Sequence, residues 1–162
     1  FNVLGPLTNP AGAEVQIVGV FDPELTEPLA RVLGELGSRA AFVVHGHGGM
    51  DELNTIGANR VSHLKNGRVT TTIIDPEMLD LPRGDPADLK GGTPDVNAKI
   101  LRGVLDGSLN STRKNAVLLN AAAALAAESG DLREGLALAK QSLESGAALR
   151  KLDELVEFGA TV

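Results

Sequence analysis

The sequence predicts an α/β fold with a mostly parallel sheet, a βαβ unit, a β-hairpin and C-terminal helices. Two short apolar runs, 15–21 and 40–45, are separated by a stretch with leucines at helical spacing, which is the pattern of a βαβ unit. Asn66-Gly67 stands between two further strand-like runs, and this dipeptide strongly indicates a hairpin. From Thr93 onward the apolar residues recur at helical spacing, so we expect the rest of the chain to be helical.

The composition is that of a globular protein and excludes several classes of function. Of the 162 residues, 43% are hydrophobic and 22% are charged, and no apolar run approaches the roughly 20 residues of a membrane-spanning helix. The absence of cysteine excludes disulfides, thiolate zinc sites and a cysteine nucleophile. A net charge of −6 with 2% aromatic residues argues against nucleic-acid binding. We therefore expect a cytoplasmic small-molecule enzyme with no nucleic-acid or membrane partner.

The first residues favour a fragment of a longer protein. The chain has no initiator methionine and no basic leader, and Phe1 to Val3 resemble a strand in progress. A proteolytic product or trimmed chain explains this start, and a processed natural N-terminus is the alternative. The glycines and prolines that follow predict a loop over residues 5–13.

Capping residues delimit the βαβ unit. The strand 15–21 ends at Asp22, which together with Pro23 predicts the start of a helix. Gly37 predicts the end of that helix. The strand 40–45 is almost wholly apolar, as is typical of a strand buried on both faces. The predicted buried face of the helix consists of Leu25, Leu29, Val32, Leu33 and Leu36.

From residue 60 onward the sequence predicts an antiparallel hairpin followed by helices. The hairpin strands span 60–65 and 68–75, and three prolines limit residues 75–88 to a short helical turn. Four helices follow, the first with an apolar face and the last with an amphipathic pattern. They span 93–107, 111–128, 131–144 and the stretch after Gly146, with Val96, Ile100, Val104 and Leu105 on the face of the first and Leu149, Leu152, Leu155 and Val156 on that of the last.

The segment 45–52, His-Gly-His-Gly-Gly-Met-Asp-Glu, is the strongest candidate site. It follows a buried strand, where open parallel sheets bind their ligands. Its glycines can expose backbone N–H groups to an anion, and Asp51 and Glu52 are the oxygen ligands that Mg²⁺ prefers. Alternatively, Asp51 caps a helical turn in a polar loop. His45 and His47 are either ligands or bases, or loop residues with local hydrogen bonds, which we favour. The glycines are not a dinucleotide fingerprint, because no helix of suitable length follows.

Three other segments are weaker candidates. The segment 5–10, Gly-Pro-Leu-Thr-Asn-Pro, is on physical grounds a rigid turn. Gly91-Gly92 with Asn97-Ala98 either shapes a helix entry near a ligand or allows tight packing, which we favour. Asn115 and Asn120 lie within a predicted helix, where asparagine is unfavourable. We therefore expect them to have buried polar roles, such as a hydrogen bond to neighbouring backbone.

An ordered set of motifs resembles the anthranilate phosphoribosyltransferase family, and the resemblance covers essentially the whole chain. The motifs are Phe1-Asn2-Val3-Leu4-Gly5-Pro6-Leu7-Thr8-Asn9-Pro10, His45-Gly46 followed by Asp51-Glu52, Gly91-Gly92 with Asn97-Ala98, and Leu118-Leu119-Asn120-Ala121-Ala122. Because related families share this fold, a pyrimidine nucleoside phosphorylase-like enzyme and a non-catalytic scaffold fragment stay open as alternatives.

The resemblance implies a reaction and a metal. It implies transfer of a phosphoribosyl group from phosphoribosyl pyrophosphate to the amine of anthranilate, which gives a phosphoribosylanthranilate in tryptophan biosynthesis. It also implies that Asp51 and Glu52 bind Mg²⁺ near the pyrophosphate. No side chain of this chain is implied as a nucleophile or other catalytic residue, and most substrate-binding residues are expected upstream of Phe1.

The chain also departs from the family pattern. A glycine-rich pyrophosphate loop, a Lys-His-Gly-Asn-type segment, an anthranilate-contacting arginine and a helical N-terminal domain all precede the point that matches Phe1. We therefore expect residues 1–162 to be the C-terminal portion of the α/β catalytic domain and to be inactive alone. The expected partners are the N-terminal part of the same enzyme and, once complete, a second copy in a homodimer.

Overall fold

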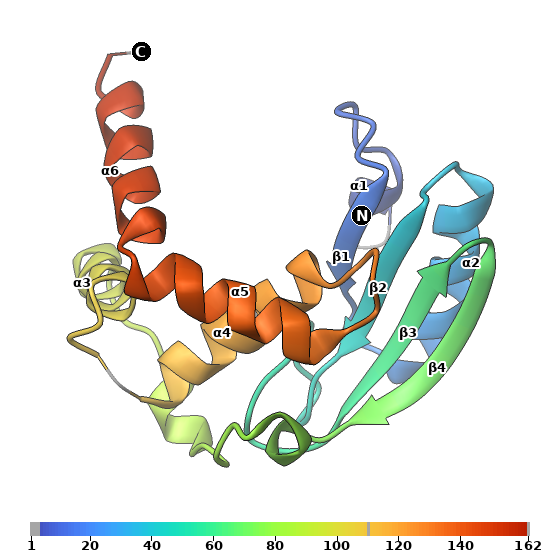
Figure 1. Ribbon diagram of the computed structural model, residues 1–162, viewed down its shortest axis with the longest axis horizontal. Coiled ribbons are helices and arrows are strands. Elements are labelled where there is room, and N and C mark those ends of the chain that lie inside the picture. Colours follow the sequence, from blue (N-terminus) through green and yellow to red (C-terminus); the bar gives the residue numbers. More distant parts are fainter. Residues whose placement is uncertain (1–3, 110, 162) are drawn as a thin grey trace.

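The computed structural model describes residues 4–109 and 111–161, so the strand expected to include Phe1 to Val3 lies outside the described residues. It contains a sheet of four strands in the order β1-β2-β3-β4 (Figure 1). Strands β1 and β2 are parallel, whereas β2–β3 and β3–β4 are antiparallel. The strands are β1 (Val15–Gly19), β2 (Ala40–His45), β3 (Asn59–Lys65) and β4 (Arg68–Ile74).

The α/β class, the βαβ unit and the hairpin are confirmed, but the described sheet is mixed and not mostly parallel. Residues 46–58, which connect β2 to β3, contain no helix. A parallel return requires a crossover that is usually helical, and the chain instead turns back and pairs His45 with Arg60. The hairpin is then closed by Asn66 at φ 51° and Gly67 at φ 71°, as a type I′ turn requires.

The helix of the βαβ unit begins where its caps predict. The Asp22 side chain accepts a hydrogen bond from the Glu24 N–H at 2.9 Å, at the start of the short 3₁₀ helix η1 (Pro23–Leu25) that leads into α2 (Thr26–Glu35). Gly37, at φ 97°, ends the helix. Strand β1 is shorter than the predicted range 15–21, although Val20 still donates to the Val44 carbonyl at 2.9 Å.

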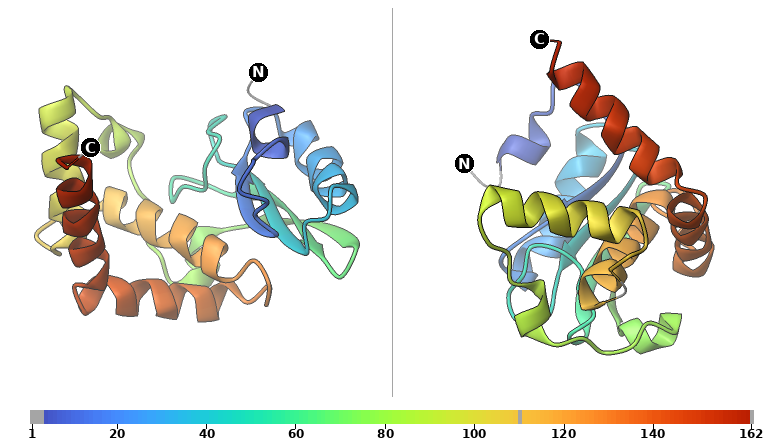
Figure 2. Two further views of the ribbon diagram at one scale, coloured as in Figure 1. Left: turned by 90° about the horizontal axis from the view of Figure 1, so that it is seen from above. Right: turned by 90° about the vertical axis from the view of Figure 1, so that its left-hand side faces the viewer.

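Helices cover both faces of the sheet, and β2 is buried on both. Ala41 and Val43 belong to the apolar cluster under α2. Phe42 and Val44 belong to the cluster formed with α4 (Thr112–Leu125) and α5 (Leu132–Glu144), which lie across the opposite face (Figure 2). The prediction of a doubly buried strand over 40–45 is therefore confirmed.

The remaining helices, α3 (Pro94–Leu105) and α6 (Ala147–Gly159), stand away from the sheet (Figure 1). Their predicted apolar faces are only partly buried: Val104 is enclosed, but Val96, Leu155 and Val156 are exposed. Leu36, expected on the buried face of α2, is 61% exposed because it lies beyond the last helical residue. No helix among the described residues is long and apolar enough to cross a membrane.

Short helical turns occupy two segments rich in proline. Residues 4–7 form the short helix α1 (Leu4–Leu7), so the predicted loop over 5–13 is wrong in its first residues. Proline is tolerated in a first turn, where its missing N–H has no acceptor, and Thr8 closes the turn by donating to the Leu4 carbonyl. The segment 75–88 holds the predicted short helical structure as two 3₁₀ turns, η2 (Pro76–Leu79) and η3 (Pro86–Leu89).

Candidate functional site

The candidate site is built on residues 46–58, which we call the site loop. The loop leaves the carboxyl end of β2, beside the carboxyl end of the parallel strand β1. The Gly46 N–H donates to the Met50 carbonyl at 2.7 Å, and Gly48 and Gly49 take φ values of 77° and 84°. These positive φ values fold the loop back over the strand ends.

Two glycines allow the backbone of the acidic pair to contact the sheet. A Cβ on Gly19, the last residue of β1, would lie 1.5 Å from the Asp51 carbonyl oxygen. A Cβ on Gly46 would lie 2.0 Å from the Glu52 carbonyl oxygen. Any larger residue at either position would displace the backbone that carries the carboxylates.

The side chains of Asp51 and Glu52 are exposed and form no ion pair with the described residues. No helical turn follows Asp51, so the alternative capping role is not realised. Nor do the described residues contain a group of three or more metal-ligating side chains. A pair of carboxylates nevertheless suits Mg²⁺, which often takes one or two from the protein and the rest of its shell from substrate phosphates and water.

The two histidines of the segment 45–52 make local contacts. His45 Nδ1 is 2.9 Å from the Val20 carbonyl oxygen. The exposed His47 places its ring over Gly57, where a Cβ would lie 2.3 Å from Nδ1. Both observations favour local contacts over a role as ligand or base, but His45 is the last residue of β2 and not, as predicted, a loop residue.

Two buried asparagines, missed by the sequence analysis, fix the second half of the loop. Asn54 donates from Nδ2 to the His47 carbonyl at 2.9 Å and accepts from the Ile56 N–H at 3.0 Å. Asn59 accepts from the Asn54 N–H and donates back to the Asn54 carbonyl, both at 3.0 Å. The available signal was a pair of asparagines on either side of Gly57 in a loop between apolar strands.

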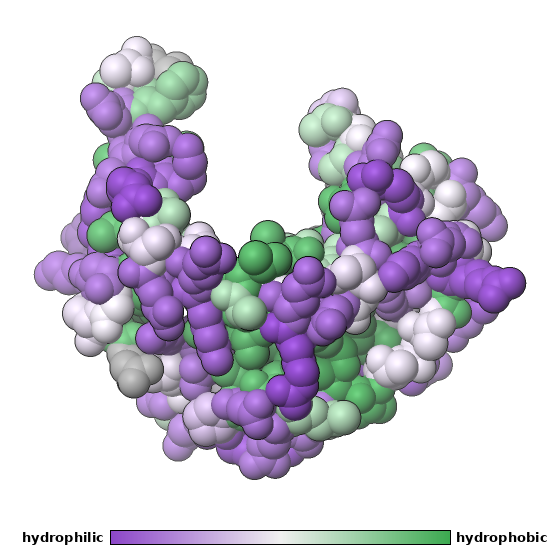
Figure 3. All heavy atoms as spheres, in the orientation of Figure 1, coloured by the Kyte–Doolittle hydropathy of each residue, from purple (hydrophilic) through white to green (hydrophobic). Residues whose placement is uncertain are grey.

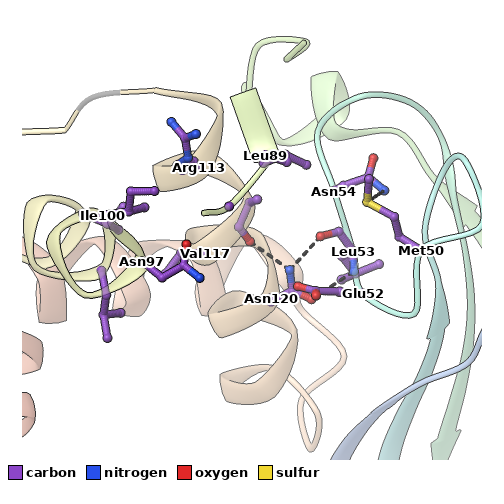
Figure 4. A pocket seen from close by; sticks show the side chains of 14 residues that line it. Met50, Glu52, Leu53, Asn54, Leu89, Asn97, Ile100, Arg113, Val117 and Asn120 are labelled. Atoms are coloured by element: carbon purple, nitrogen blue, oxygen red, sulfur yellow. Dashed lines mark hydrogen bonds between the residues drawn. The ribbon is translucent and has the colours of Figure 1, made fainter. Parts of the chain in front are cut away.

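Asn120 connects helix α4 to the site loop. Its predicted hydrogen bonding to backbone is confirmed, although the residue is half-buried and not fully buried. Its Oδ1 accepts from the Leu53 N–H at 3.0 Å, and its Nδ2 donates to the Leu53 carbonyl at 2.7 Å (Figure 4). Asn115, from which we expected a similar role, makes no side-chain hydrogen bond with the described residues.

A cavity of about 780 Å³ lies between the site loop, α3 and α4. Its polar lining includes Glu52 and Arg113, the latter also missed by the sequence analysis, and its apolar lining includes Ile100 and Val117 (Figure 4). In Figure 3, a hollow separates the part of the molecule that contains α3 and α6 from the part that contains the sheet, and hydrophobic residues form its floor. Glu52 thus stands at the edge of a large, partly apolar space, and Asp51 precedes it in the chain.

Gly91 borders the same cavity, and Gly91-Gly92 shapes the entry of α3 through close contacts with its first turns. Asn97 accepts from the Gly92 N–H at 2.8 Å and donates to the Gly92 carbonyl at 3.1 Å. A Cβ on Gly91 would lie 2.8 Å from Asn97 Oδ1. Because Gly91 and Asn97 both line the cavity, this tight packing also shapes its wall.

Comparison with known proteins identifies relatives along almost the whole chain. Residues 1–149 match the model of the glycosyl transferase family, a/b domain. The anthranilate phosphoribosyltransferase of Desulfosudis oleivorans is 51% identical over 160 residues, and that of Moorella thermoacetica is 52% identical over 160 residues. Each alignment covers 98% of this chain but 47% of the relative, so the chain spans about half the length of these curated relatives.

Solved structures of similar proteins have the same fold. The anthranilate phosphoribosyltransferase of Thermus thermophilus superposes with a TM-score of 0.87 at 42% identity, over 96% of this chain and 46% of that one. The enzyme of Saccharomyces cerevisiae in complex with PRPP and Mg superposes with a TM-score of 0.83 at 30% identity, over 98% of this chain and 46% of that one.

Proposed function

Since this chain belongs to the glycosyl transferase family, a/b domain, we propose that it works in the transfer of a phosphoribosyl group from phosphoribosyl pyrophosphate to anthranilate. The product is a phosphoribosylanthranilate on the route to tryptophan, and the compartment we expect is the cytoplasm. The observation that carries the proposal is the exposed acidic pair, Asp51 and Glu52, at the carboxyl ends of β1 and β2, with Glu52 lining a cavity. The names of the relatives supply the substrates.

Asp51 and Glu52 would hold Mg²⁺ together with the phosphates of the substrate. The fit rests on their chemistry: two adjacent carboxylates, neither engaged in an ion pair with the described residues. A bound Mg²⁺ would supply positive charge to the departing pyrophosphate.

The rest of the mechanism needs orientation more than reactive side chains. At the ribose anomeric carbon, the bond to the pyrophosphate oxygen breaks, the bond to the anthranilate nitrogen forms, and that nitrogen loses a proton. The aromatic amine is itself the nucleophile, so no residue of this chain acts as one. The site loop would contribute by holding two carboxylates that bind Mg²⁺, whose positive charge would offset the negative charge of the departing pyrophosphate.

We further propose that residues 1–162 are the C-terminal portion of an α/β catalytic domain whose other portion completes the site. Supporting this, β1 pairs with β2 along one edge only, among the described residues, and its other edge is open. An open edge is a template for a further strand, and the curated relatives are about twice as long. The complete enzyme is proposed to be a homodimer.

The test is an assay with anthranilate, phosphoribosyl pyrophosphate and Mg²⁺. We expect turnover by the full-length protein that contains this chain, none by residues 1–162 alone, and recovery when the N-terminal portion is added. Orientation supplies roughly 7–11 kcal/mol of barrier reduction in well-aligned reactions, which a single acidic pair cannot replace.

Phosphorolysis of pyrimidine nucleosides by the same full-length protein is the matched control. Phosphorolysis without phosphoribosyl transfer would contradict the proposed reaction. Robust turnover by residues 1–162 alone would contradict the need for a second portion.

A further inference from the structure

We propose that Asn120 is a positioning residue for the acidic pair: from helix α4, its amide fixes the peptide that follows Glu52, and so the direction of both carboxylates. The inference rests on the proposed function in one respect, the binding of a divalent cation by Asp51 and Glu52. Asn120 acts through the backbone of Leu53, 67 positions away in the chain.

The amide of Asn120 holds both polar groups of one residue. The Leu53 N–H donates to Oδ1 at 3.0 Å, and Nδ2 donates to the Leu53 carbonyl at 2.7 Å. The second hydrogen on Nδ2 is donated to the Ala116 carbonyl at 2.9 Å. A side-chain amide has two N–H donors, so none remains for a bound molecule. Asn120 is therefore suited to holding the loop and not to donating to a ligand.

The site loop is held by the sheet on one side of the acidic pair and by Asn120 on the other. On the sheet side, the carbonyls of Asp51 and Glu52 rest where Cβ atoms of Gly19 and Gly46 would be. On the helix side, Leu53 is buried, with 1% of its surface exposed, and its backbone is bonded to Asn120. Glu52 stands between these anchors with its side chain exposed toward the cavity.

Fixing the loop should change the affinity for a cation most where the protein supplies few of the cation's ligands. A site with two carboxylates gains affinity from their being fixed in advance, since groups outside the ligand set orient those within it. Asparagine is also a poor helix former compared with the alanines that follow it in α4. Its place in this helix is explained by the contact with Leu53.

The test is a titration of the full-length protein with Mn²⁺, in which electron paramagnetic resonance measures the concentration of free ion. The titration is done both without and with phosphoribosyl pyrophosphate. We expect Asn120→Ala to raise the Kd for Mn²⁺ about 10–100-fold, the range for residues that orient metal ligands. Asn115→Ala is the matched control, because Asn115 lies in the same helix and its side chain makes no hydrogen bond with the described residues. We expect it to leave the Kd unchanged.

Thermal unfolding of the same samples separates positioning from stability. A lower unfolding temperature with an unchanged Kd for Mn²⁺ would overturn the inference, as would a wild-type protein that does not bind Mn²⁺. If Asn120→Ala does not fold, Asn120→Ser is titrated in its place. Failure of both variants to fold would make Asn120 a core residue and overturn the inference as well.

The proposed function can fail separately. If the wild-type protein binds Mn²⁺ and Asn120→Ala weakens this binding, the inference holds even where no phosphoribosylanthranilate forms. If the wild-type protein forms the product but both proteins bind Mn²⁺ equally, the proposed function holds and the inference fails.

Discussion

Strand β3 is entered and left through two turns that use glycine for different reasons. At its start, the site loop depends on Gly46, where a Cβ would lie 2.0 Å from a backbone oxygen. At its end, the hairpin depends on Gly67, which has φ 71° and no atom within 4 Å of a built Cβ. The first glycine permits close approach of two backbones, and the second permits a left-handed conformation. Substitutions at the two ends should therefore report on different properties, site geometry and stability.

The two ends also differ in what surrounds them. The site loop faces the cavity and carries two carboxylates free of ion pairs with described residues. Near the hairpin, His63 stacks on Phe42 with 4.2 Å between ring centroids, and Lys65 donates to the Ser129 carbonyl at 2.6 Å. The site-loop end therefore carries carboxylates suited to a cation, whereas the hairpin end carries the positive charges of Lys65 and Arg68.

The largest effect is expected from removing charge at the site loop. In the full-length protein, Asp51→Asn or Glu52→Gln should weaken Mg²⁺ binding and lower the proposed turnover by about 10²–10³, the scale for losing one electrostatic stabiliser. Steady-state assays over a range of Mg²⁺ concentrations measure both effects. Wild-type turnover with unchanged Mg²⁺ dependence in both variants would refute the metal assignment.

A control for this prediction lies near the hairpin end. Glu128 pairs with Arg39, with 2.9 Å between Oε1 and Nη2. Glu128→Gln also removes one carboxylate, but exposed ion pairs contribute only about 0–1 kcal/mol. We expect turnover and Mg²⁺ dependence to stay at wild-type values.

Gly19→Ala should be the next largest change. The new methyl group would overlap the Asp51 carbonyl, and overpacking of this kind costs roughly 1–3 kcal/mol or more. We expect both a lower free energy of unfolding, measured with urea, and a weaker response to Mg²⁺ in the folded fraction. A stable Gly19→Ala protein with normal Mg²⁺ dependence would show that the loop does not need this contact.

Gly67→Val should affect stability alone. Valine disfavours the left-handed conformation of the hairpin turn, so the free energy of unfolding should fall by roughly 1–2 kcal/mol. Turnover per folded molecule should be unchanged, since no candidate ligand lies at this end. A specific loss of activity in fully folded protein would instead place the hairpin in the site.

The smallest effect is expected at Thr55 in the site loop. Its side chain is fully buried, and Oγ1 has no hydrogen-bond partner among the described residues. Thr55→Val keeps the shape and removes the unpaired hydroxyl, so stability should rise by about 1 kcal/mol or stay constant. Thermal unfolding measures this change. A loss of stability would mean that the hydroxyl has a partner in the complete protein.

Local signals predicted the elements well, because each depends on neighbouring residues. Asp22 caps its short 3₁₀ helix through its side chain, as expected, and Asn66-Gly67 forms the hairpin turn. The mixed sheet was not predicted. The direction of β3 depends on whether residues 46–58 form a crossover or turn the chain back, and the sequence of this segment does not indicate which. The exposure of Val96 was missed because helical spacing identifies an apolar face but not what covers it.

The candidate site was predicted only in part for a similar reason. Asp51 and Glu52 are adjacent in the chain, so their pairing follows from the sequence. The contact between Asn120 and Leu53 joins residues 67 positions apart. Helix and strand periodicities relate only near neighbours in the chain, so they cannot predict this contact. The close approach of Gly19 to Asp51 was likewise invisible, because a glycine in the sequence does not indicate which backbone lies against it.

The hairpin turn has one more consequence, for the chemical ageing of the protein. Asn66 is exposed and precedes Gly67, and a following glycine leaves the backbone nitrogen free to attack the asparagine amide. The resulting deamidation puts a new carboxylate between Lys65 and Arg68, which are paired across the hairpin. Stored preparations should therefore become heterogeneous in charge at the end of the sheet opposite the acidic pair.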